Sequence, residues 1–189
     1  MRAIGAIILE MDAELTGLGV RHAFGGALAL AYYADPRGTV DVDVNVGVAY
    51  EYRMPLLAQL GGIGWHADDE AVRAASAAGT RLRQVGETVV IDLFFAFDDI
   101  HQMVLDRAVA RPFFHAGERH ELRFLAVDDL VVFKVSFARS RDWADIEAIR
   151  DAGTVIDPDY VERQLVQLNG PTAYSSAARL RALLRESSD

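Results

Sequence analysis

Apolar and polar residues alternate strictly along residues 40–46, where a valine occupies every second position. A period of two is the pattern of a β-strand with one buried face. The intervening polar residues, Asp41, Asp43 and Asn45, then lie side by side on the opposite face. The pattern therefore predicts a half-buried strand over 40–47 that presents two neighbouring carboxylates.

The same kind of pattern divides the rest of the chain near residue 126 into a mixed half and a helical half. Before this point it predicts helices over 2–17, 26–34, 50–60 and 68–78, and strands over 20–24, 80–85, 89–97, 108–114 and 121–125, with 100–106 ambiguous. After it, helices are predicted over 128–139, 142–152, 158–168 and 173–186, with Asp128 as the N-cap of the first. The fold class is therefore α/β (α+β), with an α/β core over 1–126 and a helical region over 127–189.

A pair of glycines, Gly25 and Gly26, marks the junction between the first predicted strand and the helix that follows it. At such a junction the backbone turns sharply or lets another group approach closely. The N-terminus of the following helix offers unpaired N–H groups, which suit a phosphate. Taken alone, two adjacent glycines more often mark a plain tight turn. The turn over 35–39 then carries Arg37, which is either a solvated loop charge or a phosphate contact.

Three aspartates are candidate metal ligands. Asp41 and Asp43 would raise each other's pKa unless a cation lies between them. Mg²⁺ takes oxygen ligands of this kind and usually brings substrate phosphates with it. Asp92 is the only charged residue in the apolar run 88–97, where a lone buried acid is costly unless it is paired or bound to metal. An amphipathic strand with an acidic outer face, and a strand-edge acid bonded to backbone, are the alternatives.

Lys134 is the sole lysine among 19 basic residues, all the others being arginine. An ammonium is a compact charge whose role a planar guanidinium does not reproduce. It lies in an apolar predicted helix, and Asp142 and Asp145 follow three residues apart, hence on one helical face. The alternatives are a snorkelling lysine and an ordinary pair of surface acids.

Together these motifs resemble the nucleotidyltransferase superfamily with the polymerase-beta-like fold. The resemblance covers about residues 20–150, and it rests on the motifs Gly25-Gly26-Ala27-Leu28-Ala29, Arg37-x-Thr39-x-Asp41-x-Asp43 and Asp92 in a later apolar strand. The second half is similar to the AbiEii-like branch, which has a lysine in an apolar helix, an arginine-rich segment and Asp-x-x-Asp-Ile. Lys134, Asp142 and Asp145 match those positions. Many members of this branch are toxins of toxin–antitoxin systems.

The resemblance implies a small mixed twisted sheet flanked by helices, with the C-terminal helices completing the cleft. It implies a Mg²⁺-dependent enzyme that moves a nucleoside monophosphate from a nucleoside triphosphate to an acceptor. The implied catalytic residues are Asp41, Asp43, Asp92, Lys134 and Asp145, of which the first three would hold Mg²⁺ in a two-metal site. The implied nucleotide-binding residues are Gly25, Gly26, Arg37, Thr39, Lys134 and Asp142.

The acceptor stays open at this point. A toxin-like enzyme would act on the acceptor end of tRNA and would have a cognate antitoxin protein as partner. An antibiotic nucleotidyltransferase would act on an aminoglycoside or lincosamide hydroxyl. The third hypothesis is of another class: the protein is a non-catalytic module that binds nucleotide or protein.

Composition narrows these possibilities only partly. The formal net charge of −9 counts against broad coating of nucleic acid, although a local cluster such as Arg81 with Arg83, or Arg139 with Arg141, would allow one RNA end to bind. The absence of cysteine excludes disulfides and thiolate chemistry, and the expected location is the cytoplasm. No apolar stretch is long enough for a membrane span. The five histidines lack metal-ligand spacing, and the phenylalanines are most simply core.

Overall fold

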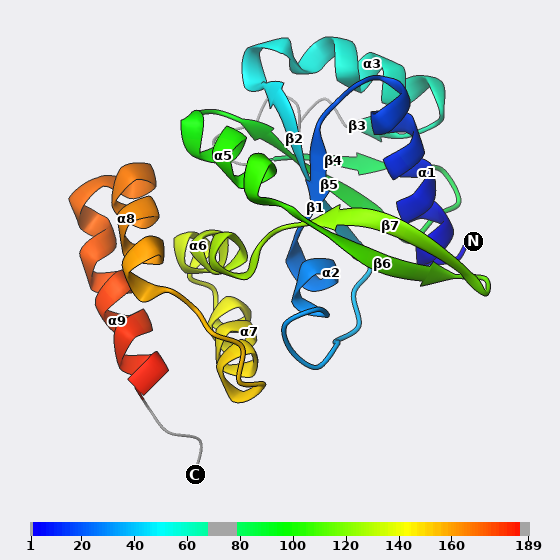
Figure 1. The fold of residues 1–189 in the computed structure, drawn as a ribbon. Coiled ribbons are helices and arrows are strands. Elements are labelled where there is room, and N and C mark those ends of the chain that lie inside the picture. The colour runs from blue at the N-terminus through cyan, green and yellow to red at the C-terminus, as the bar shows by residue number, and fades with distance from the viewer. Residues whose placement is uncertain (1, 68–78, 186–189) are drawn as a thin grey trace.

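The computed structural model describes residues 2–67 and 79–185, so the expected helix over 68–78 lies outside the described residues. A mixed sheet with strand order β3-β4-β5-β2-β1-β7-β6 forms the centre of the α/β part (Figure 1). Its strands are β1 (His22–Phe24), β2 (Asp41–Ala49), β3 (His66–Ala67), β4 (Thr80–Arg83), β5 (Val90–Ala96), β6 (Val109–His115) and β7 (Glu118–Phe124). The expected α/β class with a mixed sheet is confirmed.

Helices flank this sheet and then continue as a helical region of their own. The first group is α1 (Ile4–Gly17), α2 (Gly26–Leu30), α3 (Arg53–Gly62) and α5 (Asp99–Arg107), with a 3₁₀ turn η1 (Tyr50–Tyr52). The second group is α6 (Val127–Phe137), α7 (Ser140–Asp151), α8 (Pro158–Asn169) and α9 (Tyr174–Arg185), with a 3₁₀ turn η2 (Gly170–Ala173). No helix in these described ranges is both long and apolar enough to cross a lipid bilayer.

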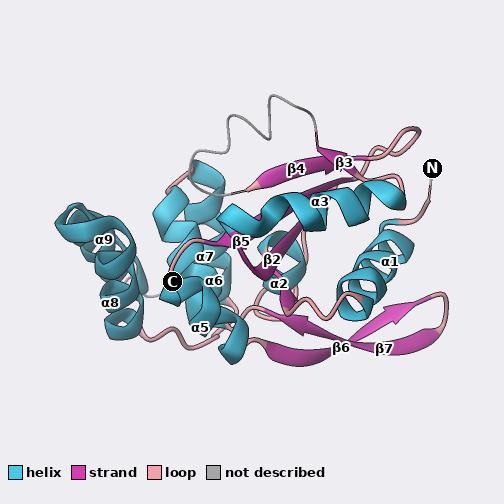
Figure 2. Cartoon of the chain, turned by 90° about the horizontal axis from the view of Figure 1, so that it is seen from above, coloured by secondary structure: helices cyan, strands magenta, loops and turns pink. Residues whose placement is uncertain are grey.

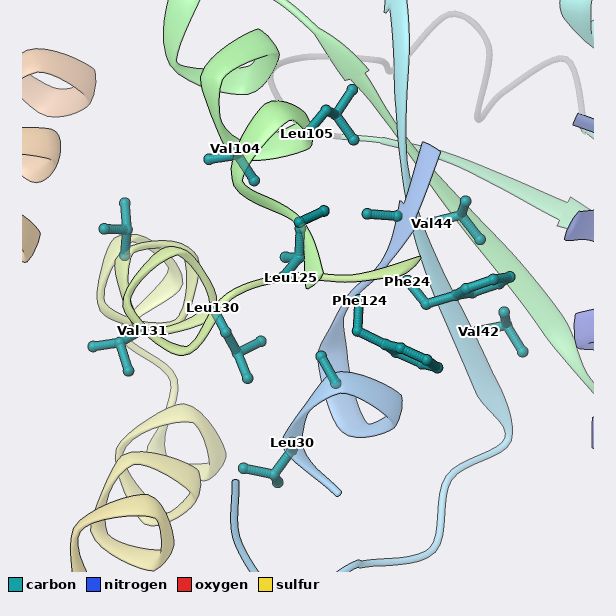
Figure 3. Close-up of a cluster of buried hydrophobic side chains, with 14 of the residues drawn as sticks. Phe24, Leu30, Val42, Val44, Val104, Leu105, Phe124, Leu125, Leu130 and Val131 are labelled. Carbon is teal, nitrogen blue, oxygen red and sulfur yellow. The ribbon is translucent and has the colours of Figure 1, made fainter. Parts of the chain in front are cut away.

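The strand β2 lies at the middle of the sheet, and most of its valine face is buried. Val42 and Val44 have no exposed surface, and they belong to the same apolar cluster as Phe24 and Phe124 (Figure 3). Burying one valine side chain contributes up to about 2 kcal/mol to folding. A shift of one residue in register would turn the acids inward, so the valines fix which face the acids occupy.

Pairing on both sides of β2 is set by this register. It runs antiparallel to β1 and parallel to β5, with Asp43 opposite Asp92. The next strand, β4, runs antiparallel to β5 and places Arg81 opposite Asp92. Residues of one face that are directly opposite on neighbouring strands have adjacent side chains. The sheet therefore gathers groups that are far apart in the sequence.

The helical region approaches the sheet through α6 and α7. In Figures 1 and 2 these two helices lie between the sheet and the outer pair α8 and α9. The helix α6 packs against α2 as well as against α7, α8 and α9. It ends at Ala138, whose φ of 51° lies in the left-handed region, and α7 begins after Arg139. The two helices are thus joined by a sharp break rather than by a continuous axis.

Several expected boundaries are wrong. Asp128 is not the N-cap of α6, because Ala126 holds that position and the Asp128 carboxylate instead accepts a hydrogen bond from the Asp157 backbone N–H at 2.9 Å. The helix α2 ends at Leu30 instead of continuing to 34. The ambiguous segment 100–106 belongs to the helix α5, which begins after the side-chain cap Asp98.

Candidate active site

One pocket of about 320 Å³ lies where the acid face of β2 and β5 meets the helices α6 and α7. We call it the central pocket. Eight of the residues expected from the sequence line it: Gly26, Arg37, Thr39, Asp41, Asp43, Asp92, Lys134 and Asp142. Further lining residues are Ala27, Asn45, Gly79, Arg81, Phe94, Leu125, Leu130, Phe133, Phe137, Arg139 and Arg141. The other two expected residues, Gly25 and Asp145, do not line the pocket. Gly25 bonds the backbone of a lining residue, and Asp145 bonds two lining side chains.

The acids of the two strands are crowded enough to affect one another. The pKa of Asp43 is raised from 3.8 to about 6, first because the side chain is buried and then because Asp92 and Asp41 repel its negative charge. Lys134 and Arg139 oppose this shift by attraction. Perturbed carboxyl groups of this kind are concentrated at functional sites, although ion-pair networks produce them too.

Gly26 has a structural reason for being glycine. Its φ of 51° is left-handed, and a Cβ at this position would lie 1.7 Å from the Asp43 Oδ2 atom. The preceding Gly25 donates its backbone N–H to the Asp43 carbonyl oxygen at 2.9 Å. The two glycines therefore bring the start of α2 directly against the strand β2. Of the two alternatives offered by the sequence, a close approach and a plain turn, the structure shows the close approach.

Lys134 is held in place by a buried carboxylate. Its Nζ donates to Asp145 Oδ2 at 2.5 Å, and Arg37 donates to both oxygens of the same group at 2.8 and 2.9 Å. Burial would raise the pKa of Asp145, but the hydrogen bonds from Arg37 and Lys134 outweigh it and lower that pKa. Asp145 thus orients two cations whose side chains line the central pocket.

Asp142 and Thr39 have local bonding partners. The Asp142 carboxylate accepts hydrogen bonds from the Arg139 side chain at 2.7 and 3.1 Å and from the Arg139 backbone N–H at 3.2 Å. It therefore caps the start of α7, and Lys134 is oriented by Asp145 instead. The Thr39 hydroxyl accepts from the Asp41 N–H at 3.1 Å and donates to the Asp41 carbonyl at 3.0 Å, which braces the first residue of β2.

Arg81 contacts the acids more directly than any residue expected from the sequence. It donates to both oxygens of Asp92, from Nε at 2.7 Å and from an Nη atom at 2.6 Å. The same Nη atom lies 3.9 Å from Asp41 Oδ1. The sequence marked Arg81 only as part of a possible arginine patch with Arg83. Nothing local indicates that β4 pairs with β5 in this register.

An aromatic wall was also missed, because the phenylalanines were expected in the core. Phe94, Phe133 and Phe137 line the central pocket, and Phe137 is 42% exposed. Phe94 follows Asp92 by two residues on the same strand, so period-two spacing was the available signal. His22 does not line the central pocket, and its ring nitrogens bond to Asp12 and to the Val20 carbonyl, both at 2.9 Å.

The acidic side of the central pocket fits a divalent cation by its chemistry. Asp41, Asp43 and Asp92 offer hard oxygen donors, and a cationic guanidinium already lies against this group. As they stand, no three acidic or histidine side chains of the described residues converge closely enough to surround an ion. Both oxygens of Asp92 bond Arg81, so the three aspartates would have to rearrange to hold a metal together.

No protein-family model matches this chain, and no curated protein matches its sequence. Solved structures do share its fold. The antibiotic-resistance factor ANT(2'')-Ia superposes with a TM-score of 0.57 at 16% identity, over 94% of this chain and 95% of that chain. A nucleotidyltransferase-like protein from Paracoccidioides brasiliensis gives 0.53 at 17% identity, over 92% and 91% of the two chains.

A third neighbour is the lincosamide antibiotic adenylyltransferase LnuA, with a TM-score of 0.51 at 10% identity, over 80% of this chain and 98% of that chain. These three similarities extend over most of both chains, and at such low identities they concern the fold. The chain has the mixed α/β fold of these nucleotidyltransferase structures.

Proposed function

We propose that this protein is a metal-dependent nucleotidyltransferase that moves a nucleoside monophosphate from a nucleoside triphosphate to an acceptor hydroxyl. The observation that carries the proposal is the combination of charges in the central pocket. Three carboxylates on the neighbouring parallel strands β2 and β5 line it, and so do Lys134 and Arg37, which are held by a shared buried acid. Carboxylates suit Mg²⁺, and fixed cations suit a triphosphate.

The chemistry is attack by the acceptor oxygen on the α-phosphorus, with pyrophosphate leaving. Such a transfer depends on positioning and on neutralising the charge of the phosphates. When bound at Asp41, Asp43 and Asp92, Mg²⁺ would supply Lewis-acid stabilisation of the phosphate oxygens. In this proposal the Asp92 carboxylate also accepts the proton of the acceptor hydroxyl.

The cations of the pocket would hold the triphosphate. Lys134 and Arg37 are fixed by Asp145, so they cost little further ordering when a phosphate binds. Arg141 lines the same pocket, and it forms no ion pair with any residue that the structure describes. It is therefore the arginine most readily available to a phosphate. The Gly25 N–H is already donated to the Asp43 carbonyl oxygen, so of this glycine pair the Gly26 backbone N–H would be the one to reach the triphosphate.

The aromatic wall would receive a flat or apolar part of a substrate. Phe94 and Phe137 lie with ring centroids 6.3 Å apart and planes tilted by 53°, and Arg139 lies over the Phe137 ring at 5.0 Å. Aromatic faces stack on nucleobases and on apolar ring systems. A nucleobase is the occupant that the proposed reaction supplies.

Two acceptors are proposed for this site. The AbiEii-like motifs favour the acceptor end of tRNA, with a cognate antitoxin protein as partner. The similarity to ANT(2'')-Ia along nearly the whole chain favours a small-molecule hydroxyl, since that enzyme has been crystallised with adenylyl-2''-tobramycin. The volume of about 320 Å³ is at the lower end of small-molecule pockets.

The test is incorporation of each labelled nucleoside triphosphate with Mg²⁺, using total RNA, an aminoglycoside or a lincosamide as acceptor. Asp41→Ala should lower transfer by at least about a hundredfold, the scale of losing one strong transition-state contact. The thermal midpoint should stay close to wild type. Asp35→Ala, an exposed acid outside the pocket, is the matched control and should transfer normally.

The result of this assay distinguishes the two acceptors and tests whether the protein is an enzyme. Lengthened tRNA, with growth arrest on expression, supports the toxin-like acceptor. A modified drug, with resistance and no toxicity, supports the small molecule. If Asp41→Ala retains wild-type incorporation, the assignment of this acid is wrong. If no acceptor yields pyrophosphate with the wild-type protein, the non-catalytic binding module replaces the enzyme.

A further inference from the structure

The guanidinium of Arg81 occupies the position in the acid group that a cation would take. It bonds both oxygens of Asp92, at 2.7 and 2.6 Å, and lies 3.9 Å from Asp41 Oδ1. Among the described residues these two acids are its only ion-pair partners. A bidentate guanidinium–carboxylate pair occupies one lone pair on each carboxylate oxygen, on the side where a chelated metal ion would also lie. The guanidinium and a chelated metal ion therefore compete for Asp92.

The pair is built so that it can open. Arg81 extends from the short strand β4, and its side chain is 43% exposed, whereas Asp92 is 18% exposed. Solvent therefore reaches the guanidinium and competes with Asp92 for its N–H groups. The hydrogen bonds and charges of Asp92, Asp41 and Asp43 favour the protonated arginine, so the pKa of Arg81 is raised and the group stays cationic. When the pair opens and a metal ion binds, one cation therefore replaces another at Asp92, and no proton is released or taken up.

We infer that Arg81 is a built-in counter-ion of the acid group, which competes with the divalent cation for Asp92 and so sets the affinity of the metal site. This inference deepens the proposed function and rests on its metal site. In the metal-free protein the arginine offsets the repulsion among the three carboxylates. When a divalent ion binds, the guanidinium leaves Asp92.

The test measures Mn²⁺ binding without nucleotide or acceptor, by titration calorimetry and by the loss of the free Mn²⁺ electron paramagnetic resonance signal. Arg81→Ala should bind Mn²⁺ about fivefold or more tightly than wild type, since a competing pair and a nearby positive charge are both removed. Arg81→Lys should fall between them, because it keeps the charge and loses the bidentate fork. Arg83→Ala is the control, on the same face of β4 but outside the central pocket.

The alternative is that the pair only ties β4 to β5. In that case Arg81→Ala would lower the thermal midpoint and leave Mn²⁺ affinity unchanged or weaker, and the inference would be overturned while the metal site stood. If neither protein binds Mn²⁺, the metal site of the proposed function fails and the competition fails with it. If Arg81→Ala does not fold, the Arg81→Lys titration decides, and equal affinity with wild type overturns the inference.

Discussion

Asp43 is the residue of the pocket whose negative charge is most destabilised by its surroundings. It lies opposite Asp92 on the neighbouring strand, two residues from Asp41 on its own strand, and against the backbone of Gly26. Burial and the two neighbouring acids raise its pKa to about 6. Arg81 bonds Asp92 and lies near Asp41, and no ion pair of the described residues is formed by Asp43. This acid would therefore gain most from a bound cation.

We expect Asp43→Asn to stabilise the metal-free protein above about pH 6, by roughly 2 kcal/mol at most after allowing for partial exposure. The folded pKa of about 6 lies above the ordinary value of 3.8, so the folded protein holds this proton more tightly than the unfolded chain. The contribution of Asp43 is fully favourable below about pH 4 and is lost as the pH rises through about 6. Urea unfolding in EDTA across this range measures the effect.

The quantity to follow is the difference in unfolding free energy between Asp43→Asn and wild type. It should grow between about pH 4 and pH 6 and stay constant above that range. Asp35→Asn, at an exposed loop position, controls for the general loss of a negative charge. A difference for Asp43→Asn that stays flat over the whole range would show that the carboxylate is not destabilised by its surroundings.

At the scale of elements, Asp145 joins three parts of the fold. It belongs to α7, it accepts from Lys134 of α6, and it accepts two hydrogen bonds from Arg37 in the segment before β2. The side chains of Lys134 and Asp145 are 6% and 5% exposed. Removing one partner of a buried pair leaves an uncompensated charge, which costs more than removing both. The network therefore couples the helical region to the sheet.

Asp145→Ala should lower the unfolding free energy by about 3 kcal/mol, because Lys134 is left buried without the carboxylate that bonds it. Lys134→Met should cost clearly less, since Asp145 keeps its bidentate bonds with Arg37. The double variant Lys134→Met/Asp145→Ala should recover part of the loss. Urea unfolding of the three variants measures this order. Equal losses for the two single variants would contradict the asymmetry.

The elements also show which parts of the site a sequence can reveal. The acid face of β2 was predictable because strand alternation is local, and Lys134 was noticed because it is the only lysine. The pairing of Arg81 with Asp92 was not, because it depends on the register between β4 and β5. A break between α6 and α7 was predicted from the sequence, but the left-handed conformation of Ala138 at that break was not, since alanine rarely adopts it. Contacts between elements, rather than the elements themselves, account for most of what was missed.

Over the whole molecule, the net charge of −9 contrasts with the cations gathered in one pocket. The basic residues that line it are Arg37, Arg81, Lys134, Arg139 and Arg141. All but Arg141 are paired with acids among the described residues. An RNA acceptor would therefore meet few available positive charges inside the pocket and a repelling field outside it.

This balance predicts a shallow salt dependence for an RNA acceptor. If about two phosphates are neutralised, raising NaCl from about 50 to about 200 mM should weaken RNA binding about sevenfold, far less than the thousandfold or greater loss of proteins that coat nucleic acid. Fluorescence titration of a labelled tRNA end would measure the slope. Arg141→Ala should make the slope shallower by about 0.7, and Arg83→Ala, outside the pocket, should leave it unchanged. A slope steeper than about −4 would require phosphate contacts well beyond the central pocket, on a surface whose overall charge opposes them.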